Sequence, residues 1–302
     1  MNYKKLTFEE IMQDKILYYD KEVESACYNI CYTLKIDNMP GYDSNYYYEL
    51  VDNKFVKKQI ADNLKLEISD RIFEPQNIEK FKNNNHNVLF VYSGKILKGI
   101  VHFADYNRNI VLKRIQDDVL NFELNLREFL VLKGKTIYDI IKFYEDSISK
   151  ENKERILNHY ERRLNFFKNK EKEINSLGEF QLCELSDLMD YCNSSFSNKI
   201  FKFENHEDFD FKIGNHIIGP LRNVVMHGKN PIEKDIFSSI FSIESLIKFH
   251  RSLEILKYYN SKLEELIYTN EDYQLSVKLE NQNKLKIIHE HHPRALKYFI
   301  GY

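Results

Sequence analysis

The sequence of 302 residues contains no tryptophan and only nine glycines, five prolines and four cysteines. It has no glycine-rich loop for a phosphate, no Ser-His-Asp order and no paired zinc ligands. Cys27 and Cys31 stand one helical turn apart, which is a poor geometry for a disulfide, and Cys183 and Cys192 lack metal-ligand spacing. This usage is typical of reduced thiols in a cytosolic protein, and we expect no metal site.

Long apolar runs are missing as well. The N-terminus has no apolar core resembling a signal peptide, and no stretch approaches the roughly 20 apolar residues of a membrane span. Neither sign of charge dominates, because 44 Lys and Arg residues face 46 Asp and Glu residues. That balance excludes a uniformly basic nucleic-acid binder and leaves room for a local basic patch. We expect a soluble, cytoplasmic protein without membrane contact.

The first half of the chain alternates between short predicted helices and strands. Residues 22–34 carry an apolar helical stripe, residues 46–51 read as a strand, and residues 54–64 read as a helix. The unit then repeats, with a helix at 77–81, strands at 88–92 and 97–102 around a Ser93-Gly94-Lys95 turn, and a long helix from about 104 towards 132. Two strand-helix-strand-strand-helix units in tandem are therefore expected within residues 1–135.

The second of these units resembles a CBS domain, so that residues 1–135 resemble a CBS-domain pair. The resemblance rests on an apolar strand at 88–92, the Gly94 turn, a Gly-Ile-Val run at 99–101, and Asp105 three residues after His102. In that family the aspartate often binds a ribose, and a Ser or Thr stands where this chain has His102. The resemblance implies that Asp105 and His102 bind a regulatory adenine nucleotide, or that the pair serves as a scaffold without a ligand.

The second half is predicted to be almost entirely helical. Gly134 and Lys135 are the best candidate joint between the halves. Helices are expected at residues 137–146, 153–177, 182–191 and 238–268, with an irregular stretch at 198–211. Residues 274–279 and 284–289 alternate weakly around an Asn281-Gln282-Asn283 turn and predict a terminal hairpin or tail over 271–302. The expected fold class is thus α+β, with an αβ region followed by a helical bundle.

A short motif within this helical half carries the strongest chemical signal. Pro220 is expected at the first position of a short helix, and Gly228 just past its end. Asn223 and His227 are four residues apart and share a face, whereas Arg222 lies about 140° around the helix from His227. One copy therefore makes an incomplete site, and a two-fold axis beside the helix would bring two copies of the motif together.

These residue types suit RNA cleavage without a metal. The ribose 2′-hydroxyl is an internal nucleophile that needs a proton acceptor, while the leaving 5′-oxygen needs a proton donor. His227 can serve as general acid or base, because the ordinary pKa of imidazole is near 6.5. Arg222 presents a planar fork that matches phosphate oxygens, and Asn223 can orient either group by hydrogen bonding.

The Arg-Asn-x3-His pattern resembles the signature of the HEPN superfamily, over about residues 136–270. The resemblance implies a dimeric helical domain, an RNA substrate, no required cofactor, and a metal-independent endoribonuclease of a toxin, antiviral or RNA-processing system, where an antitoxin is a further partner. It assigns catalysis to Arg222 and His227 and a supporting role to Asn223. Some members are inactive interaction modules. Outside the resemblance, Arg222 in an ordinary salt bridge and His227 at a helix C-terminus are also consistent with the sequence.

Other signals are weaker. His289, His291 and His292 resemble a metal tract, but adjacent residues cannot all face one ion, which favours solvated side chains. Arg162 and Arg163 form either an RNA-facing patch or a solvated helix face. The run of tyrosines at 46–48 favours a strand that alternates between core and surface. The competing functional hypothesis is a non-enzymatic, CBS-type nucleotide sensor whose helical half dimerises or docks a partner.

Overall fold

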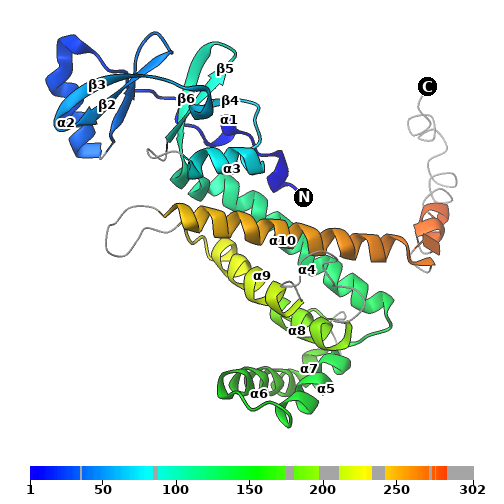
Figure 1. Ribbon diagram of the computed structural model, residues 1–302. Coiled ribbons are helices and arrows are strands. Elements are labelled where there is room, and N and C mark those ends of the chain that lie inside the picture. Colours follow the sequence, from blue (N-terminus) through cyan, green and yellow to red (C-terminus); the bar gives the residue numbers. More distant parts are fainter. Residues whose placement is uncertain are drawn as a thin grey trace. The chain divides into compact units, whose positions relative to one another are not determined.

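The computed structural model describes residues 1–34, 36–83, 88–174, 180–196, 211–232, 242–271, 274–275 and 277–283 (Figure 1). The fold is α+β, as predicted: the two small sheets lie before residue 103, and beyond that point the described residues form helices and connecting turns. Within this described part, no helix combines the length and the apolar content needed to cross a membrane.

The chain divides into two compact units, and neither is contiguous in sequence. The first comprises Met1–Val119 and Pro220–Glu254, and the second comprises Leu120–Gly219 and Ile255–Tyr302. Three helices therefore contribute to both units: α4 (Asn109–Leu132), α9 (Phe211–Met226) and α10 (Ile243–Tyr268). The contiguous modules that the sequence suggests, at 1–135, 136–270 and 271–302, stay a prediction.

The first sheet is an antiparallel meander of β1 (Asn38–Pro40), β2 (Tyr46–Val51) and β3 (Lys54–Gln59). Along β2, Tyr47 is buried while Tyr46 and Tyr48 are half-buried, so the predicted alternation is confirmed. Helix α2 (Glu24–Leu34) packs against the meander through Cys27 and Cys31, which join Tyr19 and Met39 in one apolar cluster. All four cysteines are buried free thiols.

The helix predicted over residues 54–64 is wrong. This segment forms β3 and then a 3₁₀ turn, Asp62–Leu64. Asp52 and Asn53 both have positive φ, at 48° and 62°, which is the backbone of a two-residue hairpin turn, and Val51 pairs with Lys54 across it. The exposed lysines of β3 suit an edge strand, so turn chemistry outweighs the apparent helical pattern.

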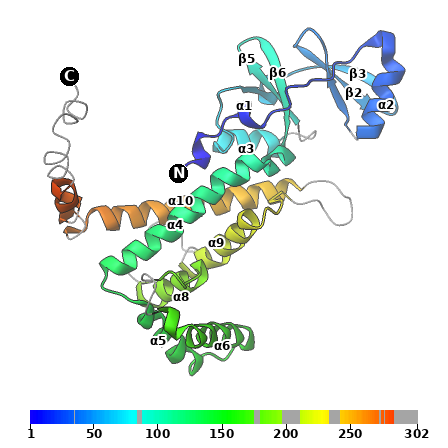
Figure 2. The same cartoon turned by 180° about the vertical axis from the view of Figure 1, so that it is seen from behind.

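The second sheet contains β4 (Lys65–Glu67), β5 (Val88–Ser93) and β6 (Ile96–His102). Strand β4 runs parallel to β5, and β5 runs antiparallel to β6. Helix α3 (Pro75–Lys82) lies beside this sheet in both views (Figures 1 and 2). With α4 the segment has the predicted strand-helix-strand-strand-helix order, although a 3₁₀ turn (Phe103–Asn107) precedes α4. Its CBS identity stays a prediction.

The second unit is built from helices. Besides its shares of α4, α9 and α10, it contains α5 (Ile137–Ile148), α6 (Glu154–Asn169), α7 (Glu171–Ile174) and α8 (Leu185–Phe196). The predicted helices at 137–146, 182–191 and 238–268 correspond to α5, α8 and α10, although residues 238–241 lie outside the described part. Of the predicted helix at 153–177, the described residues up to 174 form two helices, α6 and α7. Arg127 of α4 donates hydrogen bonds to the carbonyls of Phe180 and Cys183, which fixes the turn before α8.

Two further predictions are wrong. Residues 274, 275 and 277–279 are helical, so the first strand of the predicted hairpin does not exist, and residues 284–289 lie outside the described part. Pro220 lies inside α9 and does not open it. The buried side chains of Ile218, Leu221 and Val225 recur at helical spacing on both sides of Pro220, and this continuous apolar face outweighs the one backbone hydrogen bond that proline cannot donate.

Candidate functional site

The C-terminal end of α9 presents the three residues predicted to be catalytic. Leu221 and Val225 face the core, with 3% and 4% of their surfaces exposed, whereas Asn223 and His227 are exposed. The amide of His227 donates a hydrogen bond to the carbonyl of Asn223 over 3.3 Å, which continues the helical spacing by one residue. The backbone therefore places Asn223 and His227 on the same face, one turn apart, as the sequence predicts.

Gly228 ends this helix in the predicted way. Its φ of +60° lies in the left-handed region that glycine adopts without a steric penalty. The amide of Lys229 donates to the carbonyl of Val224 over 2.9 Å, and that of Gly228 donates to the carbonyl of Val225 over 3.4 Å. These two bonds form a Schellman cap, in which Gly228 follows the C-cap residue. His227 is therefore the C-cap of α9.

The chain beyond the cap is fixed by the side chain of Asn107, the last residue of the 3₁₀ turn that precedes α4. Asn107 donates from Nδ2 to the carbonyl of Ile232 over 2.9 Å and accepts at Oδ1 from the amide of Ile232 over 2.8 Å. Ile232 is itself fully buried. The residues between Gly228 and Ile232 thus form a short loop held at both ends, and His227 just before this loop is exposed.

Arg222 is half-buried, and some of its donors have no partner among the described residues. Its Nη1 donates to Asn223 Oδ1 over 3.4 Å, while its buried Nε has no hydrogen-bond partner in the part of the chain that the structure describes. Among the described residues Arg222 makes no ion pair with a carboxylate, which gives no support to the ordinary salt bridge. A guanidinium fork of this kind can donate hydrogen bonds to phosphate oxygens.

The structure brings His102 and Asp105 together, and it does so as a helix cap. The amide of His102 donates to Asp105 Oδ2 over 2.8 Å, and the amide of Ala104 donates to His102 Nδ1 over 2.9 Å. The other carboxylate oxygen, Oδ1, lies 3.2 Å from Gln13 Nε2 and 3.3 Å from Arg108 Nε. Both carboxylate oxygens of Asp105, the residue expected to bind a ribose, thus make contacts within the protein. This arrangement favours a structural role for Asp105.

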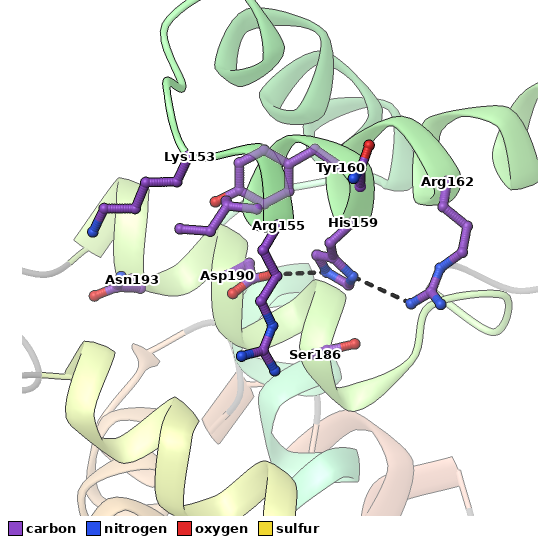
Figure 3. Close-up of a pocket in the computed structure, with 10 residues that line it drawn as sticks. Lys153, Arg155, His159, Tyr160, Arg162, Ser186, Asp190 and Asn193 are labelled. Atoms are coloured by element: carbon purple, nitrogen blue, oxygen red, sulfur yellow. Dashed lines mark hydrogen bonds and ion pairs between the residues drawn. The ribbon is translucent and has the colours of Figure 1, made fainter.

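A pocket in the second unit was not predicted as a site. It has a volume of about 910 Å³ and lies between the first turns of α6 and one face of α8 (Figure 3). Helix α8 contributes Ser186, Asp190 and Asn193, which follow helical spacing. Its cationic lining residues are Lys153, Arg155 and Arg162. Arg222, Asn223 and His227 are not part of it.

An imidazole lies at the centre of the polar residues of this pocket. His159 Nε2 is 3.3 Å from Asp190 Oδ2, and Arg162 Nη2 is 3.4 Å from His159 Nδ1 (Figure 3). Both contacts are satisfied by a ring that carries its proton on Nε2 and accepts at Nδ1. Burial, followed by the charges of Asp190 and Glu151, raises the pKa of Tyr160 to about 12, so this phenol is neutral in the pocket wall.

The sequence contains a partial signal for the pocket. The sequence groups Arg162 with Arg163, as an RNA-facing patch or a solvated helix face, but the two differ: Arg162 is exposed in the pocket, whereas Arg163 is buried with 5% of its surface exposed. Arg155, His159 and Arg162 recur at intervals of four and three residues, which indicates a shared helix face. The acidic partner of His159 comes from α8, and sequence spacing within α6 cannot reveal it.

No family model, curated protein or solved structure matches the chain. The described residues contain no group of three or more His, Cys, Asp or Glu side chains that could hold a metal ion. The candidate tract at His289, His291 and His292 lies outside the described residues. The end of α9 and the pocket between α6 and α8 are therefore the two candidate sites among the described residues.

Proposed function

We propose that this protein is a metal-independent endoribonuclease whose site is formed by Arg222, Asn223 and His227 of two copies of the chain. The observation that carries the proposal is the state of Arg222 at the end of α9. Its guanidinium contacts Asn223, keeps a buried Nε without a partner, and has no carboxylate to neutralise it among the described residues. An exposed imidazole follows one turn after Asn223.

The proposed reaction uses the RNA's own ribose as nucleophile. The 2′-oxygen forms a bond to phosphorus, the bond from phosphorus to the 5′-oxygen breaks, and a 2′,3′-cyclic phosphate and a 5′-hydroxyl are left. One imidazole accepts the proton of the 2′-hydroxyl, and an imidazolium donates a proton to the 5′-oxygen. Arg222 stabilises the additional negative charge on the phosphate oxygens in the transition state.

Two proton-transfer groups are needed, and one motif offers a single histidine. A second copy of His227, brought in by a homodimer with its two-fold axis beside the end of α9, would supply the other. The exposure of Asn223 and His227 and the short loop after Gly228 leave this face open to a partner or a substrate. Asn223 would then hold Arg222 in place through the contact at its Oδ1.

The test is an RNA cleavage assay in excess EDTA with the wild type, His227→Ala and Arg222→Ala. We expect the wild type to cleave RNA to products with cyclic phosphate ends, and each variant to lose at least about a hundredfold in rate. RNA with 2′-O-methyl riboses is the matched control, because its nucleophile is blocked. Cleavage of methylated RNA, or equal rates for wild type and His227→Ala, would contradict the proposal.

A further inference from the structure

The pocket between α6 and α8 carries more positive charge than its own residues neutralise. Three cationic side chains line it, and Asp190 is the one acidic residue in the lining. Asp190 lies beside His159, and the nearby Glu151 accepts a hydrogen bond from the backbone amide of Lys153. The side chains of Lys153 and Arg155 make no hydrogen bond or ion pair with any described residue. The excess positive charge of the pocket therefore favours the binding of an anion.

The cations are arranged along the helix. Arg155 and Arg162 are seven residues apart, so their Cα atoms lie about 10.5 Å apart along the axis of α6, with His159 between them. Lys153 stands at the start of the helix, where the exposed backbone amides add positive potential. Figure 3 shows these side chains extending from α6 along the side that faces α8. A row of this length suits an extended anion with several charges better than a single phosphate ion.

The pocket also has an apolar wall. Ile156 and Tyr160 line it, and the ring of Tyr160 is supported from behind by Tyr144, at 5.3 Å between ring centroids, and by Phe143, at 5.8 Å. Tyr160 is half-buried and keeps part of its surface in the pocket. A supported aromatic ring beside a row of cations is the pairing that single-stranded nucleic acids use, with bases on the ring and phosphates on the cations.

We propose that the pocket between α6 and α8 is a docking groove for a single-stranded segment of RNA. Arg155 and Arg162 contact successive parts of the phosphate backbone, and a base packs against Tyr160. The choice of RNA rests on the proposed ribonuclease function, whereas the groove itself rests on its charges and its aromatic wall. An acidic peptide would use the cations but has no need of the ring, and a free nucleotide would leave part of the row unused.

The experiment measures binding of a fluorescent single-stranded RNA of about 10 nucleotides by anisotropy, in EDTA. The parent protein is the full chain with His227→Ala, so binding is measured without cleavage at the proposed site. In this parent, Arg155→Ala with Arg162→Ala should weaken binding about tenfold at moderate salt. It should also reduce the slope of log affinity against log salt by about 1.4, which corresponds to two lost phosphate contacts.

The matched control is Lys168→Ala with Lys172→Ala. This pair removes two exposed cations from α6 and α7 that do not line the pocket. It should change affinity by no more than about twofold. Because the two arginines are exposed, their loss should leave the thermal unfolding midpoint unchanged, and this is measured alongside.

Three results would overturn the docking groove. They are equal affinities for the pocket and control variants, equal competition by AMP and unlabelled RNA, and equal competition by polyglutamate of the same charge. The result of this binding experiment can be distinguished from the result of the RNA cleavage assay. Binding that depends on the pocket, together with a wild type that cleaves no RNA, supports the groove and contradicts the ribonuclease alone. Cleavage that depends on His227, with no effect of the pocket variants on binding, supports the ribonuclease and contradicts the groove.

Discussion

Arg163 and Asp187 join α6 to α8 through two parallel hydrogen bonds, from Nε to Oδ1 over 2.8 Å and from Nη2 to Oδ2 over 2.5 Å. Both residues are buried, and Asp187 has no exposed surface. Tyr144 donates to Asp187 Oδ1 over 2.7 Å, and the amide of Glu184 donates to Oδ2 over 2.7 Å. Arg162 and Ser186, the neighbours of this pair in sequence, line the pocket, so the pair holds the two walls of the proposed groove together.

Breaking this pair from one side should be costly. Asp187→Ala leaves the Arg163 guanidinium charged, buried and without its main acceptor. Arg163→Met leaves the Asp187 carboxylate buried and without its main donor. We expect either variant to lose about 3–5 kcal/mol of unfolding free energy. Urea unfolding followed by circular dichroism checks this. A loss below about 1 kcal/mol, as for an exposed ion pair, would show that the pair is solvated in solution.

The sequence predicts most of the helical half correctly because its helices are long and amphipathic. It fails where a local signal competes with a pattern. Residues 54–64 resemble a helix until Asp52 and Asn53 are recognised as a hairpin turn, and Pro220 resembles a helix start until the apolar face on both its sides is considered. In both cases the deciding factor lies outside the pattern that suggests the wrong element: strand pairing across the turn for residues 54–64, and packing of the apolar face of α9 for Pro220.

The candidate sites differ in the same way. Arg222, Asn223 and His227 are recognisable because all three lie within one turn and a half of a single helix. His102 and Asp105 also lie close in sequence, but both side chains make the hydrogen bonds that cap the turn at Phe103–Asn107. The pocket needs Asp190 and Ser186 from α8 opposite Arg155 and His159 from α6. That juxtaposition depends on the packing of two helices, which only the structure supplies.

His102 should make the stability of the first unit depend on pH. Burial, partly offset by Asp105, lowers the pKa of His102 in the folded state, and its neutral Nδ1 accepts the amide of Ala104. The unfolded state therefore binds the proton more readily. The stabilisation is present above the unfolded pKa of about 6.5 and is lost as the pH falls from there through the folded pKa.

The check compares unfolding free energies of the wild type and His102→Asn at about pH 7.5 and about pH 5. Asparagine can accept the same backbone hydrogen bond but does not titrate, which makes it the matched variant. We expect the wild type to lose more stability than the variant on acidification. Equal losses would mean that His102 does not contribute to the pH dependence.

Tyr160 should contribute to RNA binding through its ring and not through its hydroxyl. We expect Tyr160→Phe to bind single-stranded RNA nearly as well as the parent. Tyr160→Leu, which keeps apolar volume but lacks a π-face, should lose about tenfold in affinity, because base stacking contributes about 1–3 kcal/mol. Anisotropy measurements on both variants decide this. Equal affinities for Phe and Leu would mean that no base stacks on this ring.

Gly228 should be required for the shape of the α9 end. At its φ of +60° an alanine would be strained although there is space for its Cβ, and we expect Gly228→Ala to lose about 1–2 kcal/mol of unfolding free energy. Gly228→Asn should lose less, since asparagine tolerates the left-handed region better. Thermal or urea unfolding of the two variants measures this. A loss for Asn equal to that for Ala would place the cause elsewhere than in the backbone conformation.

The proposed ribonuclease site should work only when two chains meet. A single α9 offers one imidazole, whereas the reaction needs a proton acceptor and a proton donor at once, so the rate per chain should fall when the protein is diluted below its dimer dissociation constant. Sedimentation velocity over the same concentration range gives the fraction of dimer. The rate per chain should follow that fraction, and His227→Ala should remain inactive throughout. A constant rate per chain in solutions that contain only monomer would show that one copy of Arg222, Asn223 and His227 is sufficient, and the paired-site mechanism would have to be abandoned.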